Sequence, residues 1–193
     1  MPSTCPCPPP GFRFQPSDAE IIGFYLINKI LGRPNAFDVI STVDVYSNSP
    51  DQLPLGNAGH FEENEWYFYT TRPNSSHFLT KDGYFATSMD EQIFHNNQVV
   101  GFKQILRFYL GRPPTGMKTN WVVHEFRVNP NIFPAGKLDN VLQVKLSSFV
   151  MCKILHTQEL FIKLSEKRVR DERDSLMIDT DEMHSKRLNL QIR

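Results

Sequence analysis

The chain has 193 residues, of which 40% are hydrophobic and 12% aromatic, so it is long enough to bury the core of one domain. Its 21 basic and 21 acidic side chains give a formal net charge of zero, which gives no support for nucleic-acid binding through bulk charge. The start lacks a signal peptide's basic and apolar regions, and no apolar run approaches the ~20 residues that span a bilayer, so we expect no secretion and no membrane partner.

The three cysteines form no even framework of disulfides. Cys5 and Cys7 lie in a proline-rich arm, residues 1–8, that no core would protect, whereas Cys152 lies near the end of the strand-rich region. This usage favours a reducing compartment. A metal clip at Cys5 and Cys7 is the sharper alternative, but no further Cys or His pair completes a tetrahedral site. We therefore expect free thiols, no metal and no cofactor.

A helix is predicted from Ser17 to Leu31. Ser17 and Glu20 have the spacing of a capping box, in which the hydroxyl and the carboxylate each bind a free N–H of the first turn. Gly32 and Pro34 end the helix. The segment leaves little polar face, so it needs cover on more than one side, and some of that cover is expected from a second subunit. Before the helix, the alternation in Phe12–Phe14 suits a short strand.

Strands are predicted where aromatic and β-branched residues gather between Gly, Pro, Asn and Asp. They cover residues 66–69, 84–87, 99–110 and 121–128, with one or two more within 141–155 and a short extended or helical segment at 39–46. The short connections favour antiparallel pairing. The prediction is thus an α+β domain over residues 9–156, followed by a charged tail, 157–193, that is either a solvated helix or disordered. A nuclear-import patch at Lys167–Arg170 is a weaker interpretation of that tail.

The strand at 99–110 has two unlike faces. Apolar side chains alternate with polar or basic ones, so one face is expected to be core and the other solvated and basic. The first face holds Val100, Phe102, Leu106, Phe108 and Leu110, and the second holds Lys103, Arg107 and Tyr109.

Motifs lie in order along the chain at residues 9–20, 43–46 with 50 and 53–54, 65–69, 99–103 through 108–109, 111–127, 137–139 and 149–155. In this order they resemble the NAC domain, a DNA-binding domain of plant transcription factors. The resemblance covers roughly residues 9–156. It implies a twisted antiparallel sheet flanked by a few short helices, acting in the nucleus on double-stranded DNA as a homodimer or as a heterodimer with other NAC-type proteins. It also implies that a sheet edge enters the major groove, which a strand pair fits sterically.

The resemblance also implies site residues. A reciprocal Arg–Glu pair of the NAC dimer matches Arg13 and Glu20, although Glu20 alternatively serves only the helix cap. The residues matched to DNA contact are Arg72, Lys81, Phe85, Ala86, Thr87, Ser88, Lys103, Arg107, Arg112 and Lys118.

The NAC stretch that contacts DNA, Trp-Lys-Ala-Thr-Gly-Lys-Asp-Lys, is altered in this chain. Phe85 is followed directly by Ala86, so one lysine is missing, and two others are replaced by Met89 and Glu91. The basic loop before it is short, at residues 72–77, and Thr115 replaces another lysine. Each lost phosphate contact removes about one released counterion and weakens binding. A missing residue also turns every later side chain to the other face unless a bulge absorbs the shift.

Two functions follow from these features. The first is a sequence-specific DNA-binding transcription regulator that acts as a dimer with a partly eroded DNA-contact strand. The alternative is a dimerising NAC-like interaction protein that modulates intact relatives without strong DNA binding of its own. An enzyme is not expected, because none of the six histidines has the spacing of a nucleophile or metal motif. On a strand, His124 and Glu125 point to opposite faces.

Overall fold

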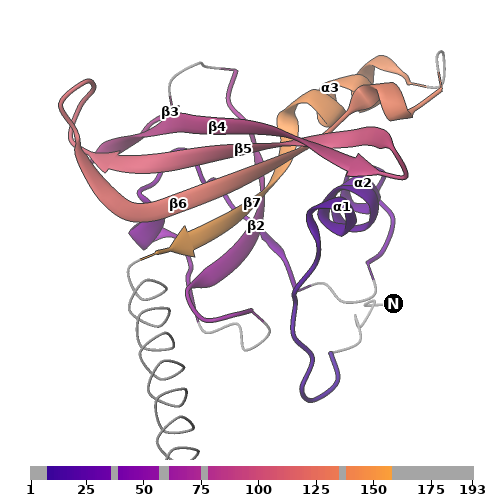
Figure 1. The fold of residues 1–193 in the computed structure, drawn as a ribbon, viewed down its shortest axis with the longest axis horizontal. Coiled ribbons are helices and arrows are strands. Elements are labelled where there is room, and N and C mark those ends of the chain that lie inside the picture. The colour runs from indigo at the N-terminus through magenta and orange to yellow at the C-terminus, as the bar shows by residue number, and fades with distance from the viewer. Residues whose placement is uncertain (1–7, 36–38, 57–60, 75–77, 135–137, 158–193) are drawn as a thin grey trace, which may run out of the picture. The chain divides into compact units, whose positions relative to one another are not determined.

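A curled seven-stranded sheet, in the order β1-β2-β7-β6-β5-β4-β3, forms the framework of the protein (Figure 1). The computed structural model describes residues 8–35, 39–56, 61–74, 78–134 and 138–157. The strands are β1 (Ser41–Thr42), β2 (Glu65–Thr71), β3 (Phe78–Leu79), β4 (Gly83–His95), β5 (Gln98–Leu110), β6 (Met117–Val128) and β7 (Phe149–His156). The helices are α1 (Asp18–Glu20), η1 (Ile21–Leu26), α2 (Ile27–Ile30), η2 (Pro50–Gln52), η3 (Pro130–Ile132) and α3 (Asn140–Ser148).

The predicted α+β class is confirmed, and so are the strands at 66–69, 84–87, 99–110 and 121–128, each within a longer strand. In the sheet order β2-β7-β6-β5-β4-β3, every pair of neighbouring strands is antiparallel, as the short connections predicted. The exception is β1, which pairs with β2 in parallel, so the sheet is mixed. The connection between β1 and β2 spans residues 43–64, which is long enough for the crossover that parallel strands need.

The predicted helix is one continuous stretch made of α1, η1 and α2. Its capping box is confirmed, because the Ser17 N–H and hydroxyl both donate to the Glu20 carboxylate at 2.8 Å and the Glu20 N–H donates back to the hydroxyl. Gly32, with φ of +66°, follows its end. The strand predicted at Phe12–Phe14 is wrong. The Phe14 ring is buried between Tyr25 and Tyr67, so the alternation there reflects packing rather than pairing.

Residues 141–148 were predicted as strand and are instead the helix α3. The Asp139 carboxylate accepts the Leu142 N–H at 2.7 Å, which caps the first turn of the helix. Of its residues, Leu146 alone is buried, so the apolar residues that suggested a strand, including Val141 and Val144, are largely exposed. The strand predicted for the rest of this segment is confirmed as β7.

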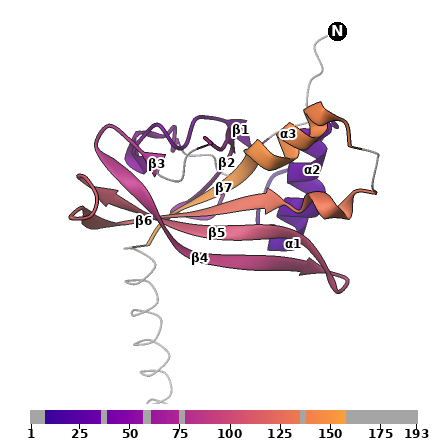
Figure 2. The same ribbon diagram turned by 90° about the horizontal axis from the view of Figure 1, so that it is seen from above.

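Buried side chains form one hydrophobic cluster on each face of the sheet. Tyr67, Phe126 and Met151 belong to the cluster that α1, η1 and α2 cover. The strand residues that follow them in sequence, such as Phe68 and Cys152, point to the other face and belong to the second cluster. This cluster also contains Val45, Tyr46 and Leu53 from the connection between β1 and β2. Figure 2 shows the three α-helices α1, α2 and α3 gathered at one end of the sheet.

The predicted division of the 99–110 strand holds for its middle. Leu106 and Phe108 are buried in the second cluster, whereas Lys103 and Arg107 point to the opposite face. The helix covers the Lys103 end of that face, so the solvated part is limited to the region around Arg107.

Two further sequence predictions concern membrane-spanning helices and metal-binding clusters. The described residues hold no helix long and apolar enough to cross a membrane. They also hold no cluster of three or more His, Cys, Asp or Glu side chains arranged to bind a metal. The arm with Cys5 and Cys7, the patch at Lys167–Arg170 and the tail beyond residue 157 lie outside the described residues.

Candidate nucleic-acid interface

The outer edge of β4 is free over most of its length. β3 pairs only with Tyr84 and Phe85, so within the described ranges no strand lies beside β4 from Ala86 onward (Figure 1). Such an edge presents backbone N–H and C=O groups to its surroundings, together with side chains of both faces. Three predicted contact residues, Ala86, Thr87 and Ser88, lie at the start of this free edge.

Ser88 forms a β-bulge in the free edge. Thr87 pairs with Leu106 and Met89 with the adjacent Ile105, so Ser88 has no partner position on β5, and its hydroxyl donates to the Ile105 carbonyl at 3.1 Å. The bulge exchanges the two faces of the strand. Phe85 consequently lies in one hydrophobic cluster and Ile93 in the other, although they are eight positions apart. A bulge of the kind that could absorb the missing residue is therefore present.

Phe85 does not reach the edge. Its side chain is buried, with its ring 5.0 Å from that of Phe108 and 6.2 Å from that of Tyr46. Phe85 thus holds the strand to the second hydrophobic cluster, and the free edge begins with the next residue, Ala86.

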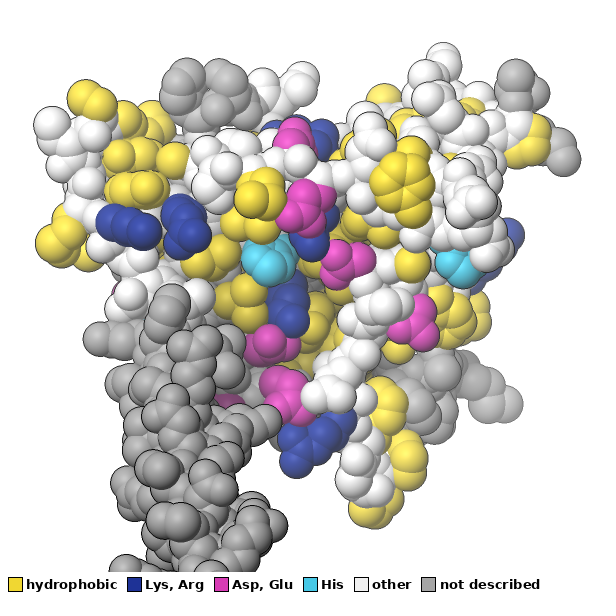
Figure 3. All heavy atoms as spheres, in the orientation of Figure 1, with side chains coloured by type: hydrophobic (Ala, Val, Ile, Leu, Met, Phe, Trp, Pro, Cys, Tyr) yellow, Lys and Arg dark blue, Asp and Glu magenta, His cyan; other side chains and the backbone are white. Residues whose placement is uncertain are grey.

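Three of the predicted basic residues lie at the end of the sheet where the free edge begins. Arg107 lies opposite Ala86, and Lys118 lies opposite Tyr109 on the same face of the sheet. Lys81 is exposed in the turn before β4. None of the three has a carboxylate partner within the part of the chain that the structure describes. At the left of Figure 3, over the ends of these strands, Lys and Arg side chains lie beside hydrophobic ones.

The other three predicted basic residues are held by groups of the same chain. Arg112 donates to the carbonyls of Thr80 and Lys81 at 3.1 and 3.3 Å and so fixes the turn before β4. Lys103 lies 2.8 Å from the Asp18 carboxylate and 2.6 Å from that of Glu91. The third, Arg72, is part of a buried network and points inward.

Two further side chains on this face, Glu91 and His124, limit its positive charge. Glu91, which replaces a lysine of the NAC stretch, forms an ion pair with Lys103, whose side chain is only 17% exposed. His124 is half-buried beside Lys103 and Lys153. Burial, followed by these two ammonium groups, lowers the pKa of His124 to about 4. The imidazole is therefore neutral at physiological pH and adds no charge to the surface.

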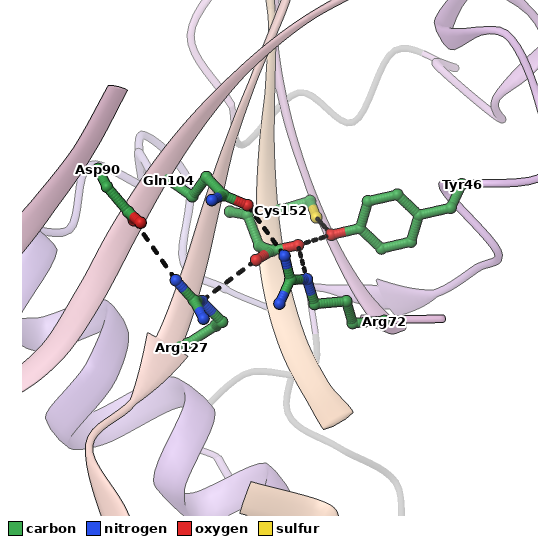
Figure 4. Close-up of polar contacts among 7 residues, drawn as sticks. Tyr46, Arg72, Asp90, Gln104, Arg127 and Cys152 are labelled. Carbon is green, nitrogen blue, oxygen red and sulfur yellow. Dashed lines mark hydrogen bonds and ion pairs between the residues drawn. The ribbon is translucent and has the colours of Figure 1, made fainter. Parts of the chain in front are cut away.

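Several polar side chains form a network around the buried Glu125 (Figure 4). The Tyr46 hydroxyl donates to its carboxylate, and the Nε atoms of Arg72 and Arg127 lie 3.3 Å from its two oxygens. These arginine contacts are ion pairs rather than aligned hydrogen bonds. Burial raises the pKa of Glu125, against the lowering effect of the Tyr46 hydroxyl and the two guanidinium groups.

Sequence reasoning missed this network. Its members come from segments that are distant in sequence, and the resemblance to the NAC domain assigns Arg72 to DNA contact instead. The one available signal was the position of Glu125 between the apolar residues Val123 and Phe126 on a predicted strand. In the structure, the Arg72 guanidinium also donates a hydrogen bond of 3.1 Å to the side-chain oxygen of Gln104, so it contacts β5.

The two predicted dimer residues lie near the first helix, each with a partner in its own chain. Arg13 contacts Glu62 at 3.0 Å and has a side chain that is 69% exposed. Glu20 is exposed and closes the capping box with Ser17. Within the described residues the structure does not bring Arg13 and Glu20 together.

A groove of about 570 Å³ lies beside Glu20, between the first helix and the β4–β5 hairpin. Phe24 and Val100 line it, together with Ala19 and His95. Phe24 is 44% exposed. The sheet covers much of the helix's apolar surface within one chain, and Phe24 in this groove is left exposed.

Comparison with known proteins places these features in one family. The family model described as No apical meristem (NAM) protein matches residues 8–128. NAC domain-containing protein 1 of Solanum lycopersicum is 36% identical over 171 residues, which is 85% of this chain and 59% of that protein. NAC transcription factor 29 of Arabidopsis thaliana is 39% identical over 153 residues, 76% of this chain and 56% of that protein. The chain therefore spans less than two thirds of these relatives' length.

Proposed function

We propose that this chain, which belongs to the No apical meristem (NAM) family of NAC domain proteins, is a nuclear transcription regulator that binds double-stranded DNA as a dimer. The printed names of relatives, such as NAC transcription factor 29, support the class. The observation that carries the proposal is the free edge of β4 at residues 86–89, with Arg107 beside it, which has no carboxylate partner among the described residues. We propose no enzymatic activity.

The positive charge near the free edge comes from a few side chains, so it is compatible with a formal net charge of zero for the whole chain. Arg107, Lys81 and Lys118 are the basic groups available for phosphates, while Arg112 fixes the turn that holds Lys81. A strand edge is narrow enough for the major groove, and flanking cations then meet the phosphate backbone on its rims. Backbone contacts position the protein, and side chains of the edge are left to contact bases.

Fluorescence anisotropy with a labelled 20-base-pair duplex tests the proposal. Three phosphate contacts per subunit predict that affinity falls about fortyfold per subunit between 50 and 200 mM salt, because each contact releases roughly one counterion. Absence of binding at 50 mM salt, or binding that salt leaves unchanged, would contradict the proposed DNA contact.

One observation favours the alternative, an interaction protein that pairs with intact relatives. Glu91 neutralises Lys103, and Met89 places an uncharged side chain at the edge, so the DNA-contact strand has little positive charge of its own. This alternative predicts that the purified chain fails to bind the duplex but forms a complex with an intact NAC protein and lowers that protein's affinity for DNA.

The dimer is proposed to use Arg13 and Glu20 reciprocally between two subunits. Arg13 is largely exposed, and its contact with Glu62 is a surface ion pair, which contributes little and is readily exchanged. The Glu20 carboxylate is used by the cap through one oxygen, Oε2, so its second oxygen is available to a guanidinium. The open groove beside Glu20 offers apolar surface for the second subunit to cover.

Replacing Glu20 by Gln separates the two uses of this side chain. Glutamine still completes a capping box, so the helix is retained, but the charge that the partner's Arg13 would meet is lost. We expect sedimentation equilibrium to show a dimer dissociation constant about tenfold higher, the effect of losing about 1.4 kcal/mol. The charge-swapped variant Arg13→Glu/Glu20→Arg should regain dimer relative to Arg13→Glu alone. A Glu20→Gln protein that dimerises like the parent would reject the pair.

A further inference from the structure

Met89 is a large apolar side chain exposed on the free edge of β4. It is 51% exposed, although most large hydrophobic residues of the sheet are buried. The residue follows the bulge and pairs with Ile105, so it lies on the same face as Ala86 and Arg107. Its position is thus at the part of the edge that the proposed function places in the major groove.

The neighbouring side chains of this edge are also poor in free hydrogen-bonding groups. Ala86 and Thr87 present methyl groups, and the hydroxyl of Ser88 donates inward to Ile105. The next residue, Asp90, is an acceptor and lies 3.4 Å from Arg127. Thr87 keeps its hydroxyl, but no side chain of residues 86–90 carries an amide or a positive charge, so the edge has few donors with which to recognise guanine, and Met89 supplies its large exposed apolar side chain.

Apolar groups distinguish one base in the major groove. Thymine alone carries a C5-methyl group there, and alanine and the threonine methyl are among the side chains that contact it. A thioether side chain is flexible and polarisable, so it adapts to such a surface without needing a fixed donor geometry. An edge rather than a face enters the groove, so side chains from both faces of β4 flank the bases.

We propose that Met89, together with the methyl groups of Ala86 and Thr87, recognises thymine through contact with its C5-methyl group. This inference rests on the proposed DNA binding and adds a base preference to it. The replacement of a NAC lysine by Met89 then changes what the edge recognises, from a charged or hydrogen-bonding group to an apolar one.

The test compares two 20-base-pair duplexes, alternating dA·dT and alternating dA·dU, which differ by the methyl group. Anisotropy at 50 mM salt should show about fourfold tighter binding of the dA·dT duplex for each methyl group that the protein buries, since one buried carbon contributes about that factor. In Met89→Ala the ratio between the two duplexes should fall toward one. Val144→Ala, a similar truncation of an exposed apolar residue on α3, should keep the parent ratio.

The outcomes separate this inference from the function on which it rests. Equal affinity of the parent for the two duplexes overturns thymine recognition and leaves DNA binding standing. A preference for dA·dT that Met89→Ala retains in full overturns the assignment to Met89. Failure to bind either duplex at 50 mM salt overturns both the inference and the proposed function.

Discussion

Replacing Glu125 by alanine should cost the protein about 3–5 kcal/mol of its free energy of unfolding. The carboxylate has no exposed surface and receives the Tyr46 hydroxyl and two arginine side chains. Its removal leaves Arg72 without a carboxylate partner among the described residues and leaves Arg127 with the exposed Asp90 alone, so the desolvation of these two side chains, both about a quarter exposed, is poorly offset. For a domain of this size the loss corresponds to a melting temperature lower by roughly 6–20 °C.

Asp90→Ala is the matched control for this prediction. Asp90 also contacts Arg127, but its side chain is 60% exposed, so it should contribute less than about 1 kcal/mol. Thermal and urea unfolding of both variants check the difference. A similar loss in the two proteins, or a Glu125→Ala protein as stable as the parent, would show that the buried carboxylate does not hold the sheet together.

Reversing the charge of Arg107 should lower DNA affinity by roughly one to two orders of magnitude at 50 mM salt. Arg107 lies beside Ala86 and has no carboxylate partner among the described residues, so its charge is available to a phosphate. Arg107→Glu removes that contact and adds repulsion. Because phosphates carry no sequence information, the loss should be similar for all duplexes, and the salt dependence should become weaker by about one counterion.

Lys145→Glu makes the same change of charge at an exposed position on α3, away from β4. It should leave affinity nearly unchanged, apart from the small effect of net charge. Anisotropy titrations of the two variants at several salt concentrations provide the comparison. Equal losses would mean that Arg107 acts through overall charge, and a changed base preference with an unchanged salt slope would mean that it contacts bases.

The sequence predicted those features whose signals are local. The capping box at Ser17 and Glu20 depends on a spacing of three residues, and the alternation around Leu106 depends on the pleat of one strand. Both are present in the structure. The edge position of Ala86 followed from resemblance to the NAC domain rather than from any local pattern.

Features that depend on distant segments could not be predicted. The apolar residues of 141–148 suit a strand, but the packing of Leu146 against distant residues of the first cluster favours a helix, and the cap at Asp139 is the local signal for it that the prediction overlooked. The inward turn of Arg72 depends on Glu125, which is distant in sequence. The bulge at Ser88 depends on matching two hydrophobic clusters on opposite faces, which becomes visible only when β4 is paired with β5.

Amide hydrogen exchange of the protein with and without a 20-base-pair duplex tests the central claim most directly. The free edge of β4 has no strand beside it among the described residues, so its outward amides should exchange rapidly in the free protein. We predict that DNA slows exchange at residues 86–89, while α3 is unaffected. Protection confined to other segments, with unchanged exchange at 86–89 in a saturated complex, would contradict the claim that this edge enters the groove.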